Sequence, residues 1–156
     1  MTSRDELAFD TSIVVETLDV KGELLRPKLD AMIFAEWAAV TKENKPVVSG
    51  IFDSFNIPSG NFPAEVPFYI YFRTSQAYQY DINIVIFSPN GLGYAKLMFP
   101  ANKQYQPVVD SANIIQHVSA LKLIFMSAGM HWFQVRYGDE ILGNVALSVL
   151  ELKTDN

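Results

Sequence analysis

Two histidines, His117 and His131, are the residues of this chain best suited to acid–base or metal chemistry. A zinc site needs three or four ligands, and the sequence lacks the local spacings that supply them, such as His-x-His or His-Glu-x-x-His. Each histidine also stands in an apolar run of the kind that forms a β-strand. We therefore interpret both as strand residues whose ring nitrogens bond to backbone groups, and we predict no metal and no cofactor.

Carboxylates act as an acid and base pair when two of them lie about 5–10 Å apart in a cleft, as in glycosidases. The candidates are scattered along the chain: Glu36, Asp53, Glu65, Asp81, Asp110, Asp139 and Glu140. The chain has no cysteine, which excludes thiolate nucleophiles and thiolate metal sites. Neither a Gly-x-Ser-x-Gly elbow nor a phosphate loop is present, because Gly91-x-Gly93 follows a tight turn and opens no helix. We predict no catalytic residues and no enzymatic activity.

The composition is that of one globular domain. The 156 residues are 49% hydrophobic, 19% charged and 13% aromatic, and the formal net charge is −5. An acidic chain without Lys/Arg clusters disfavours nucleic-acid binding. No apolar run reaches the ~18 residues of a membrane span, and the acidic N-terminus is unlike a secretory signal. We therefore expect a cytoplasmic protein with no nucleic-acid or membrane partner.

Two-residue alternation of apolar side chains predicts strands along most of the chain. The predicted strands are residues 31–40, 47–55, 68–74, 78–87, 94–99, 114–126 (as one bent strand or two), 130–137 and 141–152. The alanine-rich first run also suits a helix, but its short distance from the next strand favours a hairpin. About eight strands at this spacing predict an all-β, antiparallel β-sandwich, Ig-like or jelly-roll-like. We assign it to residues 29–156, after an N-terminal arm or extra strand at 1–28.

Between two of these strands, "NIPSGNFPAEVP" (56–67) has too many prolines for regular structure. We predict that this bend carries the chain from one sheet to the other. Gly50 is expected to mark a bulge or a close backbone approach, and Asp53 to cap the turn that follows. Buried phenylalanines should hold the crossing in place, namely Phe52, Phe55, Phe62, Phe68 and Phe72.

One group of side chains suggests binding. Tyr69, Tyr71 and Arg73 lie on the strand face opposite the expected core, and so do Trp132, Gln134 and Arg136 on theirs. If the two strands were neighbours in one sheet, these six residues would form an aromatic platform edged by guanidinium groups. Such residues anchor interfaces and stack on sugars. A second subunit or the N-terminal arm covering this face is the competing interpretation.

The stretch at 35–74 resembles a family of small, uncharacterised bacterial proteins of unknown function. The similarity lies in Glu36 and Ala38, in Lys45, in Gly-Ile-Phe-Asp at 50–53 and in Phe-Pro-Ala at 62–64, and it extends loosely to the C-terminal hairpin. The resemblance implies a compact β-sandwich in a bacterial cytoplasm and carries no active site to transfer.

The function that we predict is a non-enzymatic protein-interaction or assembly domain that binds a protein partner or associates with itself as a homo-oligomer. The run "NVALSVLEL" (144–152) is apolar on both strand faces, and such strands usually need cover on both sides. The alternative is a carbohydrate- or small-ligand-binding module that uses the aromatic face. A hydrolase on a jelly-roll scaffold is the third possibility.

Overall fold

A computed structural model describes residues 27–75, 81–101 and 114–153. The N-terminal arm predicted at 1–28 lies almost wholly outside these residues. The described chain forms nine strands: β1 Lys28–Val40, β2 Pro46–Phe52, β3 Ser54–Pro58, β4 Ala64–Ser75, β5 Ile82–Phe87, β6 Gly93–Phe99, β7 Ile114–Phe125, β8 Gly129–Tyr137 and β9 Glu140–Leu152. The alanine-rich first run is a strand, and residues 114–125 form a single strand.

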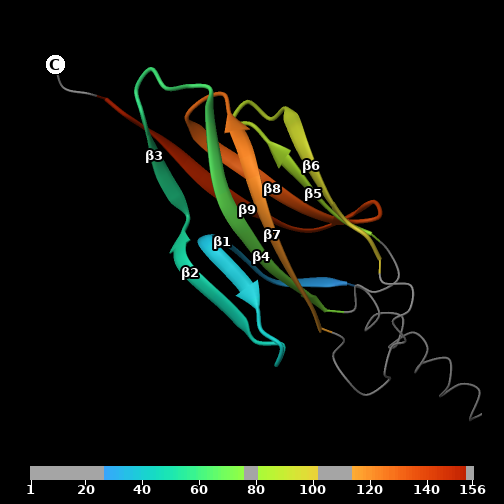
Figure 1. Ribbon diagram of the computed structural model, residues 1–156. Helices are drawn as coiled ribbons and strands as arrows, with labels where there is room; N and C mark the ends of the chain where they lie inside the picture. The colour runs from blue at the N-terminus through green and yellow to red at the C-terminus, as the bar shows by residue number, and fades with distance from the viewer. Residues whose placement is uncertain (1–26, 76–80, 102–113, 154–156) are drawn as a thin grey trace, which may run out of the picture.

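The strands form two sheets that pack face to face (Figure 1). The first, sheet A, has the order β2-β1-β4-β7, and the second, sheet B, has the order β3-β9-β8-β5-β6. Neighbours run antiparallel except β3 and β9, which are parallel. The predicted β-sandwich is confirmed. No helix long and apolar enough to cross a membrane occurs among the described residues.

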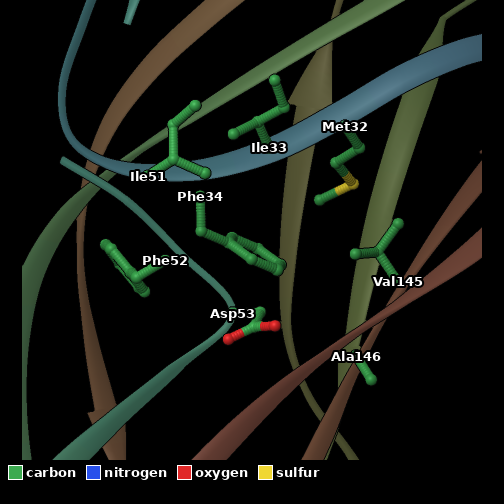
Figure 2. A pocket seen from close by; sticks show the side chains of 8 residues that line it. All are labelled: Met32, Ile33, Phe34, Ile51, Phe52, Asp53, Val145 and Ala146. Atoms are coloured by element: carbon green, nitrogen blue, oxygen red, sulfur yellow. The ribbon is translucent and has the colours of Figure 1, made fainter. Parts of the chain in front are cut away.

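The ninth strand arises because the predicted strand at 47–55 divides at Asp53. β2 pairs with β1 in sheet A as far as Phe52, and β3 pairs with β9 in sheet B from Ser54 onward. The Asp53 carbonyl accepts a hydrogen bond from the Ser148 amide at 3.0 Å, so the change of sheet is completed within one residue (Figure 2). The proline-rich bend then returns the chain from β3 to β4 in sheet A, which confirms the predicted crossing. It is shorter than predicted, because β3 extends to Pro58 and β4 begins at Ala64, which leaves only residues 59–63 irregular.

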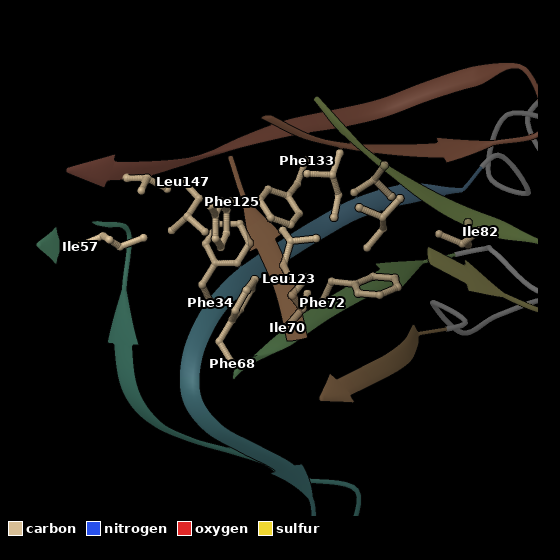
Figure 3. Close-up of a cluster of buried hydrophobic side chains, with 14 residues drawn as sticks. Phe34, Ile57, Phe68, Ile70, Phe72, Ile82, Leu123, Phe125, Phe133 and Leu147 are labelled. Carbon is tan, nitrogen blue, oxygen red and sulfur yellow. The ribbon is translucent and has the colours of Figure 1, made fainter. Parts of the chain in front are cut away.

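The core consists of side chains that point inward from both sheets (Figure 3). Phe34 lies at its centre, with ring centroids 4.7 Å from Phe133 and 6.0 Å from Phe68. Of the five phenylalanines expected at the crossing, Phe68 and Phe72 are buried, whereas the other three are only partly buried against this core. Truncating a fully buried phenylalanine typically costs about 3–5 kcal/mol, so each of the buried rings contributes strongly to the stability of the sandwich.

The β1–β2 hairpin folds back over the outer face of sheet A. β1 pairs with β4 only as far as Ala35, and its second half, cyan in Figure 1, turns back relative to the first. In the turn after β1, Asn44 accepts two hydrogen bonds from the Gln116 side chain of β7, to its backbone oxygen at 2.8 Å and to Oδ1 at 3.1 Å. Gln116 points to the outer face, so the hairpin covers part of that face.

Candidate interaction surfaces

The structure divides the predicted aromatic platform between the two sheets. β4, with Tyr69, Tyr71 and Arg73, pairs with β1 and β7 in sheet A. β8, with Trp132, Gln134 and Arg136, pairs with β9 and β5 in sheet B. All six side chains point away from the core, as predicted, but the outer faces of two packed sheets look in opposite directions. The condition for a single platform, that the two strands are neighbours, is therefore not met, because alternation defines faces and not strand order.

On sheet A, Tyr71 is not part of the accessible surface. Tyr71 is only 4% exposed although it faces outward, and its hydroxyl donates to Gln116 Oε1 at 2.8 Å. Arg73 stays exposed and lies 4.0 Å from Asp30. The competing interpretation named a second subunit or the N-terminal arm as the cover, whereas the contact seen at Tyr71 leads through Gln116 to the β1–β2 turn of the same domain.

On sheet B, the predicted residues form a smaller cluster around Trp132. Trp132 is 43% exposed and lies opposite Phe87 in the strand register. The Arg136 guanidinium carbon is 5.9 Å from the centroid of the Phe87 ring, a cation–π distance. Gln134 accepts a hydrogen bond from Arg136 and donates one to Asn144 at 3.2 Å. These contacts fix the polar side chains in the sheet and leave Trp132 as the accessible aromatic group.

Both histidines point into the protein. His131 is 1% exposed; its Nε2 lies 3.0 Å from the Ser127 carbonyl oxygen and its Nδ1 lies 2.9 Å from the Tyr94 hydroxyl. Because a carbonyl oxygen only accepts, Nε2 carries the proton, and Tyr94 donates to Nδ1. The backbone bond predicted for a strand histidine is confirmed here. Burial lowers the pKa of His131 and raises the pKa of Tyr94 to about 12.

Beside this pair lies a cavity of about 240 Å³, formed where the β5–β6 turn meets the β7–β8 turn. The turns approach closely: a Cβ added at Gly129 would lie 2.7 Å from the Pro89 ring. Leu92 and Met126 form exposed apolar walls, and Tyr94 and His131 lie at its inner side. The volume is below the roughly 300 Å³ at which small-molecule sites begin.

His117 stacks on Phe72, with ring centroids 4.3 Å apart and planes 13° apart. Its Nε2 is buried without a hydrogen-bond partner, unlike the backbone-bonded nitrogen that we predicted. Burial lowers the pKa of His117 to about 4, so the ring is neutral at physiological pH. No group of three or more His, Cys, Asp or Glu side chains among the described residues is arranged to hold a metal.

A second cavity, of about 350 Å³, lies at the side of the sandwich beside Asp53. Figure 2 shows Phe34 and Phe52 beside Asp53, with Val145 and Ala146 of β9 on the other side. Sequence reasoning missed this groove because it depends on the change of sheet at Asp53. The signal was the Gly-Ile-Phe-Asp motif. Its Gly50 adopts φ +68°, and what approaches it closely is the Glu36 side chain, not the bulge or second backbone that we predicted.

The longest open edge of the sandwich is β7. β7 pairs with β4 over 12 consecutive positions without a register shift, and no described strand pairs with its other side. Lys122 is its one lysine, and it contains no proline. Ile114 and Ile124, near its two ends, are 45% and 52% exposed. Sequence reasoning identified this strand but could not place it at an edge.

A family model for a family of unknown function, DUF6941, matches residues 30–150, so the chain belongs to that family. The match is far longer than the segment on which the resemblance was based. No curated protein matches. Among solved structures, the chain is similar to an immunoglobulin-like protein from Pseudomonas aeruginosa, with 12% identity and a TM-score of 0.41 over 80% of this chain and 96% of that one.

Proposed function

We propose that this chain is a non-enzymatic assembly domain that associates with further copies of itself. The observation that carries the proposal is the open edge of β7. Unpaired N–H and C=O groups along an edge strand are a template for pairing with another strand, and proteins that remain monomeric usually block such edges.

The other three edge strands carry the devices that block pairing. β2 has 7 residues, begins at Pro46 and contains Gly50 at φ +68°. β3 has 5 residues and ends at Pro58. β6 has 7 residues, a lysine at 96 and a register irregularity opposite β5. Short length, proline, charge and irregularity all discourage pairing, whereas β7 has 12 residues and only the lysine.

Other features favour assembly over chemistry. His117 and His131, the best acid–base candidates, are held neutral inside the sandwich. The carbohydrate-binding alternative required the six-residue platform, which the sheet order divides. We place the protein in a bacterial cytoplasm, as the resemblance implied. The absence of cysteine fits this compartment, because disulfides are rare in cytoplasmic proteins.

The test is the mass of the full chain in solution, measured by size-exclusion chromatography with light scattering at roughly 1–100 μM, a range that spans moderate affinities. The proposal predicts a mass that rises with concentration toward a multiple of the 17.5 kDa chain. A constant monomer mass across this range would refute it.

A further inference from the structure

We infer that the partner of β7 is β7 of a second copy, paired antiparallel about a two-fold axis at Ser119. The inference rests on the proposed self-assembly and adds its geometry. In an antiparallel pair centred on residue 119, two opposing positions have numbers that add to 238. The pairing then runs from Ile114 to Ile124, which is all of β7 except Phe125.

The outer-face side chains match across this register. Ile114 lies opposite Ile124 of the second copy, and both are among the large apolar side chains exposed in one chain. Gln116 lies opposite Lys122, and Val118 lies opposite Ala120. Apolar residues thus face apolar residues and polar residues face polar ones, the arrangement that stabilises cross-strand pairs.

The inner-face side chains match except at one pair. Ile115 lies opposite Leu123 of the second copy, and His117 lies opposite Leu121 as an uncharged ring. Ser119, at the axis, lies opposite its own copy, where a small side chain lets the two strands approach. The two sheets A would then form one continuous eight-stranded sheet, twice the four strands of a single copy.

Charge presents no obstacle to this pairing. Lys122 has a side chain that is 72% exposed and lies 3.9 Å from Glu65, a partner in its own chain. In the proposed register the two Lys122 residues stand six positions apart along the strands, roughly 20 Å. That separation exceeds the Debye length of about 8 Å at physiological ionic strength, so their repulsion is screened.

The second copy is favoured over an unrelated strand because nine of the eleven positions match in polarity when β7 is paired with itself, all but His117 and Leu121. A register shifted so that the two-fold axis lies at Ala120 matches less well. It places Val118 opposite Lys122 and Gln116 opposite Ile124, so an apolar residue faces a polar one at each of these pairs. The match about Ser119 is thus lost when the register moves to Ala120.

A charge-pair experiment on the full chain tests the register. Ile114→Lys with Ile124→Lys places two like-charged pairs across the interface, and the dimer dissociation constant should rise roughly 10- to 100-fold. Ile114→Glu with Ile124→Lys places opposite charges at the same two pairs and should return the constant to within about threefold of wild type. Both isoleucines are exposed in one chain, so the fold should tolerate either pair.

The control pair is Met130→Lys with Leu150→Lys, at two exposed apolar positions of sheet B away from β7, which should leave dissociation unchanged. If the Lys/Lys variant associates like wild type, pairing through β7 is refuted while self-assembly stands. If the Glu/Lys variant is as weak as the Lys/Lys variant, the register about Ser119 is refuted. A monomeric wild type would refute the proposed function itself.

Cross-linking gives an independent test because the chain has no cysteine. Directly opposed residues of antiparallel strands have Cα atoms about 4.5–5.5 Å apart, within the range of a disulfide. Ser119→Cys should therefore form a covalent dimer under mild oxidation, whereas Ser49→Cys, exposed on β2, should form no covalent dimer. Equal cross-linking of the two variants would overturn the inference.

Discussion

The Tyr71 hydroxyl donates a hydrogen bond to Gln116 Oε1 at 2.8 Å, and the amide group of the same glutamine donates to Asn44. One side chain of β7 therefore joins β4 to the tip of the β1–β2 hairpin, 72 residues away in the sequence. This link explains why an outward-pointing tyrosine is buried and why the hairpin lies against the sheet.

Gln116→Ala should release the hairpin. The substitution removes the acceptor of Tyr71 and both bonds to Asn44, and we expect unfolding free energy to fall by about 1–3 kcal/mol. Urea unfolding measures the loss, and hydrogen exchange locates it: amide protection should drop in residues 36–48 and be kept in β8 and β9.

The matched control is Gln134→Ala, which removes an outer-face glutamine of sheet B with its bonds to Arg136 and Asn144. This variant should leave hairpin protection unchanged. If the two variants reduce protection in residues 36–48 equally, Gln116 does not hold the hairpin.

Gly50→Ala should destabilise the same hairpin from within. Gly50 has φ +68°, and an added Cβ would lie 2.7 Å from the Glu36 carboxyl carbon. Left-handed backbone costs a residue with a Cβ about 1–2 kcal/mol, and the contact forces Glu36 to move. We expect a loss of about 1–3 kcal/mol in urea unfolding.

Two further variants separate the causes. Gly60 has φ +84° but nothing within 4 Å of an added Cβ, so Gly60→Ala should show the backbone cost alone. Adding Glu36→Ala to Gly50→Ala should recover part of the loss. Equal losses for the two glycine variants, with no recovery, would contradict a steric role for Glu36.

The β-sandwich could be predicted because the alternation of apolar and polar side chains along a strand shows which face of the strand is buried. Phe68, Ile70 and Phe72 alternate with polar or amphipathic side chains, and each of the three is at most 2% exposed. The change of sheet at Asp53 could not be predicted, because the residues around it look like one uninterrupted strand. Only the pairing of β3 with β9 divides them.

The binding surface could be predicted only in part, for the same reason. The outward orientation of Tyr71 and Trp132 follows from the two-residue alternation within their own strands. Their separation onto the outer faces of two different sheets depends on the strand order. Contacts within sheet A such as that between Asn44 and Gln116 join residues far apart in the sequence. The open edge of β7 is likewise a property of the sheet and not of the strand.

Acid should destabilise the protein through His117. The pKa of His117 is lowered from 6.5 to about 4 in the folded state by burial, so the unfolded state binds more protons between these values. Stability is therefore complete above about pH 6.5 and falls as the pH decreases toward 4. Urea unfolding between pH 4 and 7.5 should show this slope.

His117→Phe keeps a ring against Phe72 and removes the titration, so the acid slope should become shallower. The slope that remains includes His131, whose pKa burial also lowers. If the variant keeps the wild-type slope, His117 does not have a lowered pKa. An NMR titration of the wild-type protein in which the His117 resonance shifts near pH 6.5 would show the same.

Tyr94 and His131 should be energetically coupled. Tyr94→Phe removes the O–H that donates to Nδ1 of a histidine that is 1% exposed, and the unfolding free energy should fall by about 1–2 kcal/mol.

His131→Phe keeps a ring beside Phe125 but discards both ring nitrogens. Once His131 is gone, Tyr94→Phe should cost little, so a double-mutant cycle by urea unfolding should give a coupling of about 1 kcal/mol. Losses that simply add would show that the 2.9 Å contact contributes nothing to stability.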